Sequence, residues 1–163
     1  MTLAGHPFRV VLDTNILLRG LLNMRSASGR VVEACDSRAV VLLLSKPVVS
    51  EYRAVLTDPA LVERHPELAL EKVETALARL RYVGESLRSV NARFDYPRDP
   101  KDSKFIELAI AGGATHIVSG DNDLLCLASG HTDAAMRFRQ RARHTRVVDA
   151  PTFLREMEPS KRK

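Results

Sequence analysis

The sequence predicts an α/β fold: a mostly parallel, five-stranded sheet with helices on both faces, arranged in three layers. Three observations predict this fold. Five short apolar runs alternate with segments of helical periodicity along the 163 residues. The first run is nearly continuous in apolar residues, which is the pattern of a strand buried on both faces. Strands separated by helices form parallel sheets that are covered on both sides, and this chain length suits one domain.

The first predicted strand is FRVVL at residues 8–12, where four of five side chains are apolar. The other four are expected at residues 39–44, 81–85, 116–119 and 145–148. Each is short, and the runs at 39–44, 116–119 and 145–148 contain Val, Leu or Ile side by side, as buried strands do. The first run stops abruptly at Asp13, and apolar residues resume at Ile16. A carboxylate in such a place needs a partner, a capping role or a cation.

Helical periodicity fills the intervals between the strands. Helices are expected at residues 16–22, 30–35, 48–56, 68–80, 103–111 and 152–157. The fourth has apolar residues at helical spacing: Leu70, Val73, Leu77 and Leu80. Gly112 and Gly113 follow the fifth helix, and glycine is the usual residue after a helix end. The elements therefore alternate as the fold requires.

Composition narrows the functional classes. The chain is 45% hydrophobic and 28% charged, with a net charge of +5 that is compatible with a nucleic-acid partner. No stretch approaches the roughly 20 apolar residues of a membrane span, so we expect a cytoplasmic protein without a signal peptide or membrane segment. Cys35 and Cys126 lie far apart, which argues against a disulfide framework or a thiol zinc site.

Six acidic residues occur near the ends of the predicted strands. Asp13 follows the first strand, and Glu51 lies in the helix after the second. Asp99 and Asp102 lie at the start of the fifth helix, and Asp121 and Asp123 follow the fourth strand. The carboxyl ends of parallel strands share one edge of the sheet, where ligands bind. We therefore expect these acids to cluster there and to bind a hard divalent cation, Mg²⁺ or Mn²⁺.

Each acid also has a purely structural interpretation. Asp99 suits an N-cap before Pro100, and Asp102 would favourably face the helix dipole in the first turn. However, Asp102 shares a helical stripe with apolar residues, namely Phe105, Ile106 and Ala109. That stripe directs its side chain towards the core, which capping does not require.

The remaining acids leave similar alternatives open. Asp121 and Asp123 would suit a turn, and Glu51 would suit a surface ion pair with Lys46 or Arg53. A calcium loop is excluded at DND, because the required downstream Gly and Glu are missing. Asp13 has the weakest structural alternative, because a turn between two apolar runs costs core area.

Two other enzyme classes do not fit the first strand. A haloacid-dehalogenase-type phosphatase needs a second acid two positions after Asp13, where Asn15 stands. A dinucleotide-binding enzyme needs GxGxxG after the strand, whereas DTNILL follows it. No histidine is placed to act as a general base, which favours metal-dependent chemistry over histidine catalysis.

Four motifs in order resemble the PIN domain: VVLDTNILLRGLL, LSKPVVSEYRAVL, DPKDSKFIELAIAGGATHIVSGDNDLL and RVVDAPTFLREM. More narrowly, they resemble the toxin components of bacterial and archaeal toxin–antitoxin systems related to the VapC toxins. The resemblance implies a single PIN domain over residues 1–157, and the last residues, 158–163, are expected to form a disordered basic tail. It also implies a Mg²⁺- or Mn²⁺-dependent endoribonuclease with RNA as substrate, a cognate antitoxin protein, and a homodimer or higher homo-oligomer. The alternative is a non-catalytic PIN module that holds RNA or a protein.

The resemblance also implies the roles of individual residues. The catalytic acids would be Asp13, Glu51, Asp102 and Asp121. Asp13, Asp102 and Asp121 would hold the principal ion, and Glu51 and Asp123 would complete its ligand shell or support a second ion. The supporting residues would be Asn15, Ser119 and Asp99.

One segment departs from the family pattern. Residues 129–144, SGHTDAAMRFRQRARH, form an insertion with arginines at alternate positions: Arg137, Arg139, Arg141 and Arg143. On a helix, the first and third would lie on one side and the other two on the opposite side. The segment is either a solvated insertion or an arm that contacts RNA phosphates.

Overall fold

The computed structural model describes residues 8–159, and in them the sheet has five strands that are all parallel. The strands are β1 (Arg9–Leu12), β2 (Val41–Leu44), β3 (Glu85–Ser86), β4 (His116–Val118) and β5 (Arg146–Val148). Their order across the sheet is β3-β2-β1-β4-β5. The predicted α/β class with a five-stranded parallel sheet is confirmed.

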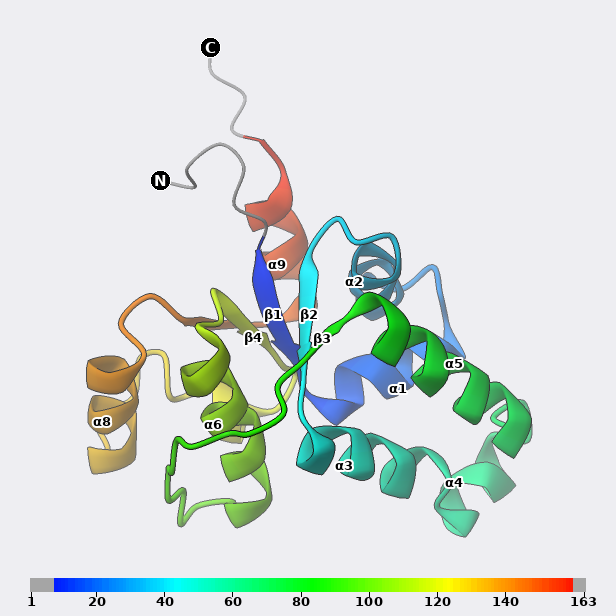
Figure 1. Ribbon diagram of the computed structural model, residues 1–163, viewed down its shortest axis with the longest axis horizontal. Coiled ribbons are helices and arrows are strands. Elements are labelled where there is room, and N and C mark those ends of the chain that lie inside the picture. The colour runs from blue at the N-terminus through cyan, green and yellow to red at the C-terminus, as the bar shows by residue number, and fades with distance from the viewer. Residues whose placement is uncertain (1–7, 160–163) are drawn as a thin grey trace.

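Helices connect the strands and cover the sheet (Figure 1). They are α1 (Thr14–Leu22), α2 (Ala27–Asp36), α3 (Lys46–Leu56), α4 (Pro59–Arg64), α5 (Leu70–Val83), α6 (Ser103–Gly112), α7 (Asn122–Leu125), α8 (Asp133–Arg141) and α9 (Ala150–Met157), with the 3₁₀ turn η1 (Pro100–Asp102) before α6. Helix α6 packs against β1, β2 and β4, whereas α9 packs against β4 and α2. Within residues 8–159, no helix combines the length and the apolarity that crossing a membrane requires.

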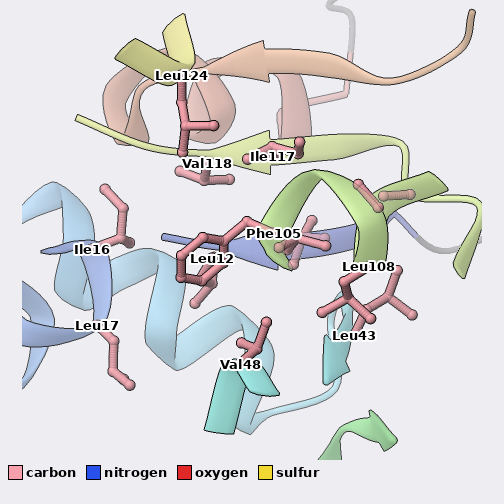
Figure 2. Packing of buried hydrophobic residues seen from close by; sticks show 14 of the residues in the cluster. Leu12, Ile16, Leu17, Leu43, Val48, Phe105, Leu108, Ile117, Val118 and Leu124 are labelled. Atoms are coloured by element: carbon pink, nitrogen blue, oxygen red, sulfur yellow. The ribbon is translucent and has the colours of Figure 1, made fainter. Parts of the chain in front are cut away.

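The core lies between the central strands and these helices (Figure 2). The central strands are almost completely buried, as their uninterrupted apolar sequences predict. Phe105 and Leu108 of α6 pack into the same cluster as Leu12 and Leu43. Tyr52 of α3 is also buried there, and its hydroxyl donates a hydrogen bond to the carbonyl oxygen of Leu12 at 2.6 Å. That bond holds the middle of α3 beside the carboxyl end of β1.

The third strand differs from the prediction. A strand was expected at residues 81–85, but α5 continues through Val83, and β3 contains only Glu85 and Ser86. The apolar stripe of α5 extends the helix, and the chain then turns tightly towards β2 at Gly84. A Cβ atom there would lie 2.8 Å from the carbonyl oxygen of Leu80 and 3.0 Å from that of Leu42. Only glycine permits so close an approach of two backbones.

Two short helices, α4 and α7, were not predicted because neither is long enough to show apolar periodicity. Each nevertheless begins with an aspartate cap. Asp58 accepts a hydrogen bond from the amide of Ala60 at 2.9 Å, and Asp121 accepts one from the amide of Asp123 at 2.9 Å. The insertion folds as α8, which Thr132 caps. Of the predicted tail, residues 158 and 159 are described and residues 160–163 lie outside the described part of the chain.

Candidate metal centre

Four carboxylates meet beyond the carboxyl ends of β1 and β4. Asp99, Asp102, Asp121 and Asp123 each offer one oxygen, and these oxygens all lie within 4.8 Å of one another. We call this group the acid cluster. Two members come from the η1 turn and its cap, and two come from the start of α7. Asp13 and Glu51, which were expected to belong to the same site, lie beside the cluster rather than in it.

Asp99 combines the two roles considered for it. It caps η1, because its Oδ1 accepts a hydrogen bond from the amide of Lys101 at 3.1 Å. Pro100 at the first helical position completes the expected N-terminal signal. A carboxylate has two oxygens with several lone pairs, so capping leaves Asp99 free to face a cation.

Asp102 is the most unusual member of the acid cluster. Its side chain is 6% exposed, and its Oδ2 has no hydrogen-bond partner among residues 8–159. Burial raises its pKa to about 7, with further increases from the charges of Asp99 and Asp13. An unpartnered, buried carboxylate oxygen is costly in free energy. A bound cation would supply the missing partner.

Asp121 stands at the junction of β4 and α7. Its Oδ1 caps α7, so the turn-forming role expected for it is present. Its own amide donates to Ser119 Oγ at 2.9 Å. The same Ser119 hydroxyl donates to Asp13 Oδ2 at 2.7 Å. One buried serine thus links the acid after β1 to the acid after β4.

Asp13 is buried and has a raised pKa. Burial is the main cause, the hydrogen bond from Ser119 and the backbone amide of Thr14 oppose it, and the charges of Asp121 and Glu51 raise the pKa further. The Asp13 side chain makes no capping hydrogen bond to α1. Capping therefore does not explain why this carboxylate is held at the end of β1. Asn15 lies exposed in the first turn of α1.

Glu51 lies close enough to Asp13 for its charge to raise the pKa of that residue, and it pairs with a different cation from those expected. Its Oε2 lies 3.0 Å from Nζ of Lys104 in α6. An ion pair with Lys46 or Arg53 had been the alternative, and that expectation is wrong. Arg53 instead pairs with Glu74 at 2.9 Å, because α5 packs beside α3.

The family model described as PIN domain matches residues 9–123. The match spans more than half of the chain and contains all six acids. The chain belongs to the PIN domain family. No curated protein sequence matches it. PIN domains are generally metal-dependent nucleases, and the oxygen-only acid cluster of this PIN domain fits that chemistry.

Two residues of this PIN domain that support Asp123 were missed in the sequence. Arg98 Nε lies 2.5 Å from Asp123 Oδ1, and the Tyr96 hydroxyl donates to the carbonyl oxygen of Asp123. Both lie just before Asp99, so they bring the η1 turn and α7 together. The only available signal was their closeness in sequence to the DPKD motif. Their partner lies 25 and 27 residues further along the chain, and periodicity does not reveal such pairings.

Two arginines of the 129–144 insertion contact residues 93–95, which precede the acid cluster along the chain. Arg137 and Arg141 lie on one side of α8, as the helical spacing predicts, and their guanidinium carbons are 5.3 and 5.9 Å from the centre of the Phe94 ring. Both also donate to backbone carbonyl oxygens of that segment, and Arg139 donates to the carbonyl oxygen of Leu127 at 3.1 Å. Helix α8 ends at Arg141, so Arg143 lies beyond it. A role for these arginines in RNA binding stays a prediction.

Proposed function

We propose that this PIN domain is a Mg²⁺- or Mn²⁺-dependent endoribonuclease that hydrolyses phosphodiester bonds in RNA. One observation carries the proposal. Within the described part of the chain, Asp102 has a buried oxygen without a hydrogen-bond partner, and that residue belongs to a group of four converging carboxylates. Asp123 pairs with Arg98, but the other three carboxylates form no ion pair with any residue between 8 and 159, and they repel each other unless a proton or a further cation intervenes. The donors are all oxygens, which hard divalent cations prefer over softer metals.

Each group would have a distinct role. Asp99, Asp102, Asp121 and Asp123 would hold the ion, with Asp13 adding negative charge beside them. When bound, a divalent ion lowers the pKa of a water molecule and neutralises charge on the phosphate oxygens. Ser119 would orient Asp13 and fix the backbone at Asp121 through its two hydrogen bonds. Lys104 would hold Glu51 in position near Asp13.

The biological role proposed is the toxin of a toxin–antitoxin pair. It is supported by the four sequence motifs, which resemble toxin components of this family. The role includes a cognate antitoxin protein, a homodimer or higher homo-oligomer, and action in the cytoplasm. The alternative is a PIN module that binds RNA or a protein without cleavage. An intact set of acids favours catalysis over that alternative.

Cleavage of single-stranded RNA tests the proposal. Purified protein should cleave the RNA with Mg²⁺ or Mn²⁺ and should stop when EDTA is added. Asp102→Asn should lower the rate by at least about 100-fold, because even outer-shell residues of metal sites are worth 10–100-fold. Glu63→Gln removes one negative charge from the exposed surface of α4 and should leave the rate unchanged. Undiminished cleavage in EDTA would contradict the proposed mechanism.

A further inference from the structure

A groove runs along the start of α3, at the same edge of the sheet as the acid cluster. It consists of two adjoining pockets of about 380 and 320 Å³. The pockets share four lining residues, so they form one continuous depression: Ser45, Lys46, Leu87 and Arg88. One wall is the start of α3, and the opposite wall is the chain that follows β3. We call this depression the basic groove.

The groove carries a high density of positive charge. Six cations and one acid, Glu107, line it; the cations are Lys46, Arg53, Arg81, Arg88, Arg93 and Lys104. Three of them pair with acids, since Arg53 pairs with Glu74, Arg93 with Glu107 and Lys104 with Glu51.

The other three cations are exposed and form no ion pair with any residue between 8 and 159. They are Lys46, Arg81 and Arg88. Like charges gathered in a recess repel each other and attract an anionic partner. The charge of the groove therefore indicates a polyanion.

The groove and the acid cluster lie at the same edge of the sheet. Ser45 follows the carboxyl end of β2 and Leu87 follows that of β3, whereas the acids follow β1 and β4. All four strands are parallel, so these ends meet at one edge (Figure 1). Lys104 lies on the side of the groove that faces the acids, because it lines the groove and its Nζ lies 3.0 Å from Glu51. Glu51 in turn lies close enough to Asp13 for their charges to interact, and Asp13 does the same with Asp102 of the acid cluster.

We propose that the basic groove binds the sugar–phosphate backbone of a single-stranded RNA, which passes from the acid cluster along the start of α3 towards Arg81. This inference rests on the proposed function, since it assigns the path of the strand that the acid cluster would cleave. Each pocket has the volume of a small-molecule site, which suits single nucleotides rather than a duplex. Its serine hydroxyls and cations are the groups that contact phosphates.

The residues that line the groove also predict whether it distinguishes one RNA sequence from another. The residues that line the two pockets include no aromatic side chain on which a base could stack. Contacts to phosphates position a strand without reading its sequence. The groove should therefore bind RNA strands of different sequence with similar affinity.

The test measures binding without cleavage. A fluorescently labelled single-stranded RNA is titrated in EDTA at several salt concentrations, and log affinity is plotted against log salt. The triple variant Lys46→Ala, Arg81→Ala, Arg88→Ala should flatten the slope by about 2, at roughly 0.7 for each phosphate of a single strand that is no longer neutralised. An unchanged slope would overturn the assignment.

A matched control removes the same charge elsewhere. Arg25, Arg30 and Arg64 are exposed and form no ion pair within the described range. Their triple alanine variant should keep the wild-type slope, whereas an equal decrease would show that only net charge matters and would overturn the proposal. Single Arg88→Glu provides a second test if the triple groove variant does not fold. It should weaken binding several-fold.

Two further comparisons distinguish RNA from an acidic protein as the partner of the groove, and the groove proposal from the nuclease proposal. Polyglutamate should compete weakly with RNA at equal charge concentration, and equal competition would assign the groove to an acidic protein instead. Because binding is measured in EDTA, it does not depend on catalysis. Normal groove-dependent binding without metal-dependent cleavage would contradict the proposed nuclease function alone, whereas cleavage without groove-dependent binding would contradict the groove alone.

Discussion

At the scale of single residues, Asp102 shows how burial and charge combine to prepare a carboxylate for a cation. Desolvation is the largest cause of its raised pKa, and the neighbouring aspartates add to it. Both effects penalise the ionised form. In the protein without metal, the residue therefore keeps a proton at pH values where an exposed aspartate has lost it.

This raised pKa predicts how the metal-free protein responds to pH. The pKa of Asp102 is about 7 in the folded protein, against 3.8 as the ordinary value, so the folded state binds the proton more tightly. The resulting stabilisation is fully present below about pH 4 and is lost as the pH rises through about 7. In EDTA, Asp102→Asn should therefore melt at a higher temperature than the wild type near pH 8, with a smaller difference near pH 5. Thermal melts at the two pH values measure this, and a variant that melts lower at both would contradict it.

Asp13 allows a second test at this scale. Asp13→Asn removes a buried charge whose pKa is raised chiefly by desolvation, and its remaining side-chain oxygen still accepts from Ser119 Oγ. We expect RNA cleavage to fall by about 10–100-fold, as for other residues just outside a metal site, while the melting temperature in EDTA is unchanged or raised. Ser119→Ala is the matched control, because it leaves the buried charge without its hydrogen bond and should lower that temperature. A large fall for Asp13→Asn would indicate a structural role instead.

At the scale of elements, the predictions succeeded where periodicity is strong and failed where single contacts decide. The buried strands β1, β2 and β4 were predicted because continuous apolar runs have few other uses. The strand predicted at residues 81–85 was wrong because Arg81 and Tyr82 continue α5. The close approach of two backbones at Gly84 is a tertiary contact, which the sequence pattern does not reveal. Helices of four to six residues, such as α4 and α7, are too short for periodicity to detect.

Gly84 provides a stability prediction for the junction between α5 and β3. Gly84→Ala would place a Cβ atom within 3.0 Å of two backbone oxygens, which cannot move aside as a side chain can. We expect a decrease in stability of about 1–3 kcal/mol, as for other overpacked sites, and a lower melting temperature. Gly120→Ala is the control, since its Cβ atom would meet only the flexible end of Arg19, at 3.2 Å. Equal melting temperatures for the two variants would contradict the argument.

Helix α8 provides a second prediction at this scale. The double variant Arg137→Ala, Arg141→Ala removes both cations from the Phe94 ring and two hydrogen bonds to the 93–95 backbone. Exposed cation–π contacts contribute about 0.5–1 kcal/mol each, so we expect a measurable fall in melting temperature. Arg143→Ala, which lies beyond α8, should leave it unchanged. The salt titration of the same double variant tests the predicted RNA contact, because each arginine that neutralises a phosphate contributes about 0.7 to the slope.

At the scale of the whole molecule, the sequence was sufficient to predict the location of the site but not its detailed arrangement. Acids that follow parallel strands must approach one edge, and topology alone requires this. Which carboxylates share a ligand-sized space depends on the η1 turn and the cap of α7. The Arg98–Asp123 ion pair helps to set that geometry, and only tertiary structure reveals it. Asp99, expected in a supporting role, therefore lies inside the acid cluster, whereas Asp13 lies beside it.

The same arrangement predicts that metal binding and stability depend on each other. A ligand that binds only the folded state stabilises it by about 2.7 kcal/mol at a concentration 100 times its Kd. For a chain of this size, that energy raises the melting temperature by roughly 5–10 °C. A proton on Asp102, whose pKa is about 7, competes with the ion, so Mg²⁺ or Mn²⁺ should raise the melting temperature more near pH 8 than near pH 5. Differential scanning calorimetry with and without the metal measures the shift. Glu63→Gln should retain the full shift, and Asp102→Asn should lose most of it and its dependence on pH. A shift of equal size at both pH values in the wild type would mean that Asp102 is not a ligand.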